Sequence, residues 1–282
     1  MVYIKYILIV VVFLNPGHIN AELPNQNAIA SAHPLATQAG HLILQRGGNA
    51  FDAAVAVSAA LSVVEPYSSG LGGGGFFLLH RNSDDFTTFI DGREVAPLMS
   101  KPDMYLDSDK NFIPKSSLVG PLASGIPGLP AALVHISKQY GKLPLSVSLK
   151  PAIKLAEEGF PAYRRLNTAL NVAKRSSVLS PKFQEIFLPN KQLPEAGYLI
   201  TQPELANTLR IIASEGHDGF YNSDFTKTIV NETNKDGSIW SLADFKKYKI
   251  VERQPIKVSF EDFTLTLAPP PSSGGTTIAT IL

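Results

Sequence analysis

Two short stretches of this 282-residue chain hold residue types that could act on or bind a small molecule. In the first, Ser68 and Ser69 stand directly before the glycine-rich residues 70–75. A serine becomes a nucleophile when a base takes its proton, and backbone N–H groups of nearby glycines can stabilise an oxyanion. No activating base is identifiable in the sequence, so we favour the interpretation that both hydroxyls bond to the backbone of a turn.

The second stretch centres on Arg93, which is flanked by Asp91 and Glu94. A guanidinium group is a permanently charged fork of donors that suits a planar carboxylate on a ligand. The alternative is an internal ion pair between Arg93 and one of the two neighbouring acids. From these residues alone, the two interpretations are evenly balanced.

Composition and spacing exclude several other classes of site. The chain has no cysteine, which excludes disulfides, thiol catalysis and thiolate metal sites. Its six histidines include no i, i+4 pair suited to a metal, and nothing supports a metal or organic cofactor. Residues 70–75 match G-x-G-x-x-G, but a helix is expected before them and a strand after, the reverse of a dinucleotide site. A net charge of +1 gives no field that would attract nucleic acid.

The elements that must position these residues are predicted by caps and apolar patterns. A helix is expected between Pro34 and Gly47, and a buried helix over residues 50–64, with Asn49 as its N-cap and Asp52 three residues on. Two strands joined by a polar turn are then expected. The glycines therefore lie between a buried helix and a hairpin, and Arg93 directly follows the hairpin.

The rest of the chain indicates a layered α/β or α+β domain. A short strand is expected at residues 28–30 and an irregular crossing loop at 95–127. The hairpin strands are residues 76–80 and 86–91, further helices are expected over 129–140, 145–158, 204–214 and 225–235, and late antiparallel strands over 256–260 and 263–267.

Residues 1–21 have the features of a secretory signal peptide. Lys5 precedes an apolar run over residues 6–14, and a break follows before the small residue Ala21. The run is far shorter than the roughly 20 residues that span a bilayer. We expect cleavage near Ala21 and a periplasmic or secreted protein, with an uncleaved membrane anchor as the alternative.

Seven further segments form an ordered set of motifs, namely residues 46–54, 65–76, 91–97, 125–128, 140–144, 151–161 and 269–275. Through these motifs and their order, the chain closely resembles the gamma-glutamyltransferase family over about residues 28–282. Members of that family are also called gamma-glutamyl transpeptidases or glutathione hydrolases.

This resemblance implies an N-terminal-nucleophile hydrolase with an αββα sandwich, made as a precursor that cuts itself into a large and a small subunit. The new N-terminal Thr of the small subunit would attack the gamma-glutamyl carbonyl of glutathione or a related amide, with its own amine as the base. Water, an amino acid or a short peptide would then accept the acyl group. No metal or organic cofactor is implied.

By the same resemblance, Arg93 matches the arginine that binds the α-carboxylate of the glutamyl group, and Glu94 matches a positioning partner. The catalytic threonine has no counterpart in residues 1–282. Thr276 and Thr277 follow a glycine pair, but no histidine follows them, and the motif before them belongs to the large subunit.

Residues 22–282 are therefore expected to be an incomplete large-subunit domain that is inactive alone. The alternatives are a non-catalytic homologue that binds a ligand or partner, and an acylase of the same superfamily.

Overall fold

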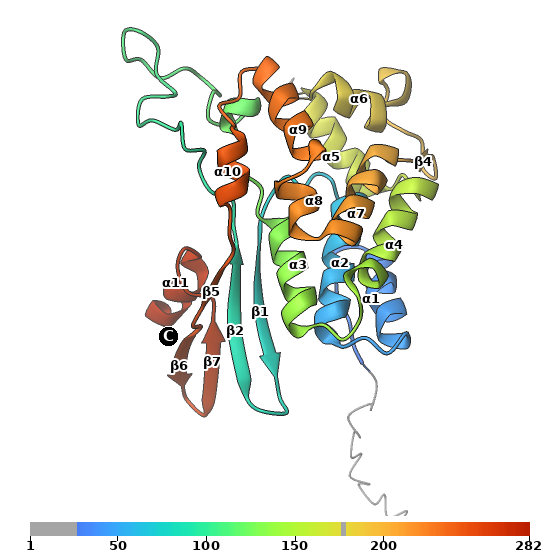
Figure 1. Cartoon of the computed structure of the whole chain (residues 1–282), viewed down its shortest axis with the longest axis vertical. Coiled ribbons are helices and arrows are strands. Elements are labelled where there is room, and N and C mark those ends of the chain that lie inside the picture. The colour runs from blue at the N-terminus through green and yellow to red at the C-terminus, as the bar shows by residue number, and fades with distance from the viewer. Residues whose placement is uncertain (1–26, 176–178) are drawn as a thin grey trace, which may run out of the picture.

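The computed structural model describes residues 27–175 and 179–282 as a mixture of helices and strands (Figure 1). The predicted signal peptide at residues 1–21 lies outside the described residues. The helices are α1 (Pro34–Gln45), α2 (Ala50–Val64), α3 (Leu129–Tyr140), α4 (Leu145–Glu158), α5 (Arg164–Arg175), α6 (Pro181–Phe187), α7 (Pro203–Glu215), α8 (His217–Tyr221), α9 (Asp224–Lys235), α10 (Leu242–Lys247) and α11 (Ser273–Ile281). The strands are β1 (Gly75–Arg81), β2 (Phe86–Gly92), β3 (Phe160–Pro161), β4 (Leu199–Ile200), β5 (Val251–Arg253), β6 (Ile256–Phe260) and β7 (Phe263–Leu267).

Helix α2 lies at the centre of the helical half, where α1, α3 and α4 pack around it. Its sequence is apolar nearly all round, and Val55, Ala59 and Val63 are among its fully buried residues. A helix without a polar face has no side to present to water, so burial on several sides is the stable arrangement. The predicted buried helix is confirmed.

The cap of α2 also joins two segments far apart in the sequence. The Asn49 side chain accepts hydrogen bonds from Phe51 N–H and Asp52 N–H, while the Asp52 carboxylate accepts one from Asn49 N–H. Asp52 is fully buried and also accepts N–H bonds from Lys142 at 2.9 Å and Leu143 at 3.3 Å. One carboxylate therefore starts α2 and fixes the turn between α3 and α4.

Strands β1, β2 and β5 form an antiparallel sheet in that order. One face packs on α3, where Glu252 of β5 accepts hydrogen bonds from Tyr140 at 2.8 Å and pairs with His135 at 2.5 Å. Burial opposes ionisation of Glu252, but the bonds from His135 and Tyr140 outweigh it and hold the pKa of Glu252 below its ordinary value. The contact of the sheet with α3 is thus partly polar.

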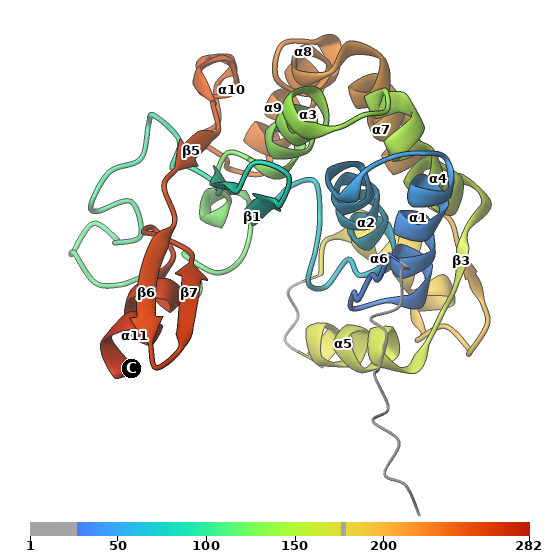
Figure 2. The same cartoon turned by 90° about the horizontal axis from the view of Figure 1, so that it is seen from below.

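The opposite face of this sheet looks away from α1–α4 (Figure 2) and is only partly exposed, since Phe89 and Asp91 on it are buried. By strand register it carries Phe76, Leu78 and Val251, whose exposed fractions are 37%, 45% and 44%. In both views the β6–β7 hairpin and α11 lie on one side of the sheet and α1–α4 lie on the other. Three apolar residues on this face therefore keep more than a third of their surfaces exposed.

The mixed fold confirms the predicted class, and the hairpin, the helices at 129–140 and 145–158 and the late strand pair are confirmed within a residue or two. The strand expected at residues 28–30 is wrong, because that segment pairs with no described strand and instead borders a hollow against α2. In the described part of the chain, no helix has both the length and the apolar character needed to cross a bilayer.

Candidate functional site

Arg93 directly follows β2, and its side chain is exposed. Among the residues that the structure describes, no carboxylate forms an ion pair with its guanidinium. Asp91, two residues before Arg93, pairs with Arg253 instead. The internal ion pair considered from the sequence is therefore not formed, and the guanidinium is available to a ligand. Its role as a ligand-binding group stays a prediction.

The backbone of Arg93 is held on both sides of the residue. The Asp91 carboxylate accepts a hydrogen bond from Arg93 N–H at 3.1 Å, and the Tyr248 hydroxyl donates one to the Arg93 carbonyl at 2.8 Å. Both partners are buried, with 7% and 3% exposed. An exposed side chain thus projects from a backbone position that is fixed.

The charge of Asp91 is balanced by Arg253 of β5. Both Nε and Nη2 of Arg253 lie 2.8 Å from the same oxygen, Oδ2, of Asp91. A buried carboxylate is costly without an opposite charge and donated hydrogen bonds, and Asp91 has both. Asp91 is therefore a structural acid that supports Arg93 rather than an acid facing a ligand.

Glycines let the backbone pack closely around Arg93. A Cβ on Gly74 would lie 2.6 Å from the Gly92 carbonyl oxygen and 2.8 Å from the Arg93 Cα. A Cβ on Gly128 would collide with the Tyr248 hydroxyl and with the Gly92 carbonyl oxygen. None of the glycines at 70–75 has a positive φ, and close approach of the backbone explains Gly74 but not Gly72, which has no atom within 4 Å of an added Cβ.

Glu94 is exposed and lies beside the same glycines. Its Oε1 would be 3.3 Å from a Cβ on Gly73, and its Cβ 2.9 Å from one on Gly125. Burial raises the pKa of the Tyr248 hydroxyl, and the negative charges of Asp91 and Glu94 raise it further, so Tyr248 remains a protonated donor.

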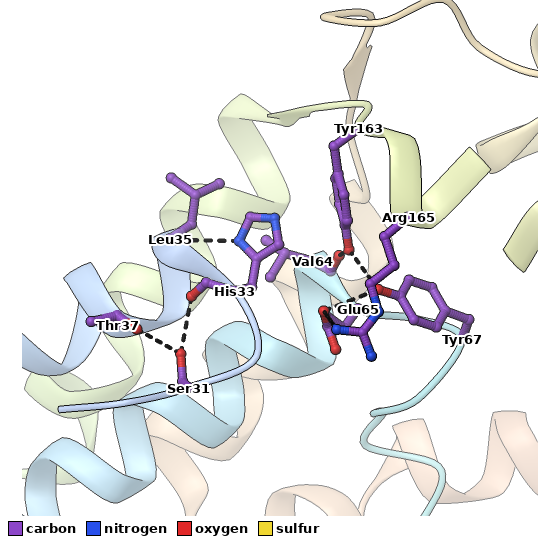
Figure 3. Close-up of polar contacts among 9 residues, drawn as sticks. All are labelled: Ser31, His33, Leu35, Thr37, Val64, Glu65, Tyr67, Tyr163 and Arg165. Carbon is purple, nitrogen blue, oxygen red and sulfur yellow. Dashed lines mark hydrogen bonds and ion pairs between the residues drawn. The ribbon is translucent and has the colours of Figure 1, made fainter. Parts of the chain in front are cut away.

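Ser68 and Ser69 lie in a turn after α2. Just before them in the sequence, Glu65 and Tyr67 form a polar cluster with Tyr163 and Arg165 (Figure 3). The N–H groups of both serines donate to the Glu65 carbonyl, at 3.0 and 2.9 Å. No base in the described chain contacts either hydroxyl. The two residues thus lie in a turn that their backbone groups close, and the interpretation that their hydroxyls bond to the turn backbone stays a prediction.

The polar cluster holds the segment that leads from the end of α2 to the glycines at 70–75. The Tyr67 hydroxyl donates to Oε1 of Glu65 at 3.0 Å, and the Tyr163 hydroxyl donates to the Val64 carbonyl at 2.7 Å. Glu65 is 2% exposed, with Arg165 3.9 Å away, and burial raises the pKa of both tyrosines. These contacts hold the end of α2 but supply no nucleophile.

Thr276 and Thr277 lie on α11, next to the β6–β7 hairpin (Figure 1). The Thr276 hydroxyl donates to the Ser273 carbonyl at 2.9 Å, as in the first turn of a helix. In the described part of the chain, no group of three or more His, Cys, Asp or Glu is arranged to hold a metal.

Two residues of the site were missed by the sequence analysis, Tyr248 and Arg253. They lie 155 and 162 positions from the residues that they contact, and no local pattern marks them. Only a comparison of many related sequences could have linked such distant positions.

The comparisons with known proteins cover the part of the chain that contains the residues described above. The family model described as gamma-glutamyltranspeptidase matches residues 36–282. The chain is 37% identical over 255 residues to a glutathione hydrolase proenzyme of Bacillus subtilis (strain 168), covering 90% of this chain and 43% of the relative. It is 40% identical over 262 residues to a glutathione hydrolase proenzyme of Escherichia coli (strain K12), covering 91% and 44%. The chain thus spans less than half the length of these curated relatives.

A solved structure shows the same fold. The crystal structure of Helicobacter pylori gamma-glutamyltranspeptidase matches with a TM-score of 0.85 and 36% sequence identity, covering 90% of this chain and 74% of that one. The mixed fold described above is therefore that of a family with solved members.

Proposed function

Because the chain belongs to the gamma-glutamyltranspeptidase family, we propose that it is the large-subunit part of an enzyme that hydrolyses or transfers gamma-glutamyl groups. The observation that carries this proposal is Arg93, whose free guanidinium projects from a fixed backbone. A two-pronged donor of this kind recognises a carboxylate such as the α-carboxylate of a gamma-glutamyl donor.

The proposed reaction uses the large subunit for binding and a small subunit for chemistry. Arg93 holds the α-carboxylate, which places the gamma-carbonyl where the N-terminal Thr of a small subunit attacks it. The threonine amine takes the hydroxyl proton as the oxygen bonds to the gamma-carbonyl carbon. The amine then passes this proton to the leaving nitrogen as the amide C–N bond breaks, which leaves an acyl-enzyme. Water completes hydrolysis of glutathione or a related amide, and an amino acid or peptide completes transfer. The small subunit is thus the chain's partner.

The division of labour is tested with a gamma-glutamyl anilide, whose cleavage releases a coloured amine. We expect no turnover by residues 22–282 alone, because the nucleophile, its amine base and the oxyanion donors would come from the small subunit. We expect turnover when the chain is assembled with a small subunit. Turnover by the chain alone, lost in a Thr276→Ala/Thr277→Ala variant, would refute the division and make one of these threonines the nucleophile.

We also propose that the protein is exported to the periplasm or secreted. Residues 1–21 would act as the signal peptide, as their charge and apolar run suggest. N-terminal sequencing of protein recovered outside the cytoplasm should begin at residue 22. Recovery of intact Met1 in the membrane fraction would instead support the anchor.

A further inference from the structure

We propose that residues 241–253, here called the clamp segment, position Arg93 for ligand binding, and that Tyr248 is the main positioning residue. This inference rests on the proposed function, because it assigns the support of the same binding group. The clamp segment comprises Ser241, the whole of α10, the link to β5 and β5 itself. It contacts the segment 91–98 at three places.

The first contact is made by Asp244 at the start of α10. Its Oδ2 accepts hydrogen bonds from Ser241 N–H at 2.7 Å and from the Ser241 hydroxyl at 2.6 Å, which caps the helix. Its other oxygen, Oδ1, accepts Leu98 N–H at 2.6 Å. Asp244, which caps α10, therefore also holds Leu98 at the end of the segment 91–98.

The second contact is the hydrogen bond from the Tyr248 hydroxyl to the Arg93 carbonyl. The Tyr248 ring stacks on Tyr221 of α8, with centroids 5.3 Å apart and planes 8° from parallel. The Tyr221 hydroxyl in turn donates to the Pro127 carbonyl at 2.8 Å. Stacking on a ring that is itself held leaves the Tyr248 hydroxyl little freedom to move away from Arg93.

The third contact is the pairing of Arg253 with Asp91, whose other oxygen accepts Arg93 N–H. Asp91 could turn toward water or toward the Arg93 side chain if Arg253 were absent. Arg253 thus keeps Asp91 on the backbone of Arg93 and leaves the Arg93 guanidinium unpaired.

The need for this support follows from the exposure of Arg93. No described carboxylate orients its guanidinium, so the direction of the side chain depends on its backbone. Recognition of a carboxylate by two parallel hydrogen bonds requires that the fork be presented in one orientation. A loosened backbone would therefore weaken binding of the α-carboxylate without altering the reacting groups.

The test compares Tyr248→Phe with wild type in the chain assembled with a small subunit. Donors are a gamma-glutamyl anilide and the matched 4-aminobutanoyl anilide, which lacks only the α-carboxylate. We expect KM for the gamma-glutamyl donor to rise about 2- to 10-fold with kcat unchanged, the effect of one lost hydrogen bond used in binding. The kcat/KM for the 4-aminobutanoyl donor should stay within about twofold of wild type, since that donor never uses Arg93.

The matched control is Tyr140→Phe, which removes a hydroxyl donor to Glu252 on the opposite face of the same sheet. We expect this variant to leave the KM of both donors unchanged even if it melts at a lower temperature. If Tyr248→Phe does not fold, Arg253→Lys replaces it, because lysine keeps the charge beside Asp91 but makes fewer hydrogen bonds to it.

An Arg93→Ala variant separates the two proposals. If Arg93→Ala does not affect the gamma-glutamyl donor selectively, the ligand role of Arg93 fails, and the positioning role fails with it. If Arg93→Ala is selective but Tyr248→Phe and Arg253→Lys change neither donor, or change both equally, the clamp segment is only structural. In that case Arg93 keeps its proposed role and the positioning proposal is overturned.

Discussion

At Arg93, charge and shape contribute separately to ligand binding. Lysine would keep the charge but replace the planar fork with a single ammonium group, which cannot make two parallel hydrogen bonds to one carboxylate. Because Asp91 is engaged by Arg253 and by the Arg93 backbone, it would not compensate by holding the new side chain. The substitution therefore isolates the geometry of the contact.

We expect Arg93→Lys to lower kcat/KM for gamma-glutamyl donors by roughly one to two powers of ten in the assembled enzyme. A hydrogen bond to a charged group contributes about 1.5 to 3 kcal/mol, and about 1.4 kcal/mol corresponds to a tenfold change. Steady-state kinetics on the two anilides measures the effect. Equal losses for both donors would show that Arg93 is a structural residue of its turn.

Gly128 gives a second prediction at this scale. A methyl group there would collide with the Tyr248 hydroxyl and the Gly92 carbonyl oxygen. We expect Gly128→Ala to lower the free energy of unfolding by about 1 to 3 kcal/mol, as overpacking commonly does. Gly72→Ala is the control, because no atom lies within 4 Å of the new Cβ. Urea unfolding of both variants should separate them, and equal midpoints would contradict the crowding argument.

How much of the site the sequence predicted depends on the distance over which residues interact. The pairing of Asn49 with Asp52 was predictable, because the capping motif lies within four residues. The support of Arg93 by Tyr248 was not, because no sequence period connects residues 155 positions apart. The support of the Arg93 backbone by Tyr248 therefore became known only from the structure.

Among the elements, α1 begins with an unusual cap. The Nδ1 atom of His33 accepts a hydrogen bond from Leu35 N–H at 3.1 Å. In most helix caps a serine, threonine, aspartate or asparagine oxygen is the acceptor, whereas here it is the unprotonated ring nitrogen. Burial lowers the pKa of His33, although the charge of Glu65 opposes the shift. Folding therefore favours the neutral imidazole.

This cap should make stability depend on pH. Because the pKa of His33 in the folded state lies below its ordinary value of 6.5, the unfolded chain takes up the proton first as pH falls. The stabilisation is fully present above pH 6.5 and is lost between 6.5 and the lower pKa of the folded state. Asparagine also caps helices but does not titrate, so unfolding free energies of His33→Asn should fall less with acidification than those of wild type. Parallel curves from about pH 7 to pH 5 would refute a contribution from His33.

The elements that the sequence predicted are those with strong caps or long apolar patterns, such as α1, α2 and the β1–β2 hairpin. Helix α5 was not predicted, because only Leu166 and Leu170 of its residues are buried and most of its other residues are polar. The expected strand at residues 28–30 failed for a different reason. A strand needs a neighbour, and the local sequence does not say whether one is present.

On the scale of the whole molecule, the face of the β1–β2–β5 sheet opposite α3 carries partly exposed apolar residues. Phe76, Leu78 and Val251 lie there with more than a third of their surfaces exposed. Exposed apolar sheet faces promote association. The proposed small subunit would be a suitable cover.

We therefore expect the isolated chain to self-associate, and Leu78→Lys to reduce the association. Light scattering coupled to size-exclusion chromatography, over a range of concentrations, measures the change. Leu42→Lys on α1 is the control, since Leu42 is 39% exposed against 45% for Leu78 but lies on a different surface. A concentration-independent monomer, or an equal effect of the two lysines, would show that the sheet face does not mediate the contact.

The wide sequence separation of the clamp contacts has a consequence for the order of events during synthesis. Asp91 is translated 162 residues before Arg253, and Arg93 is translated 155 residues before Tyr248. The β1–β2 hairpin is a local structure and forms early, whereas contacts between distant residues form late. A nascent chain that has not reached Tyr248 can therefore contain the hairpin and Arg93 while the arginine backbone is still unrestrained. Binding competence at this site is therefore acquired only after residue 253 has been synthesised.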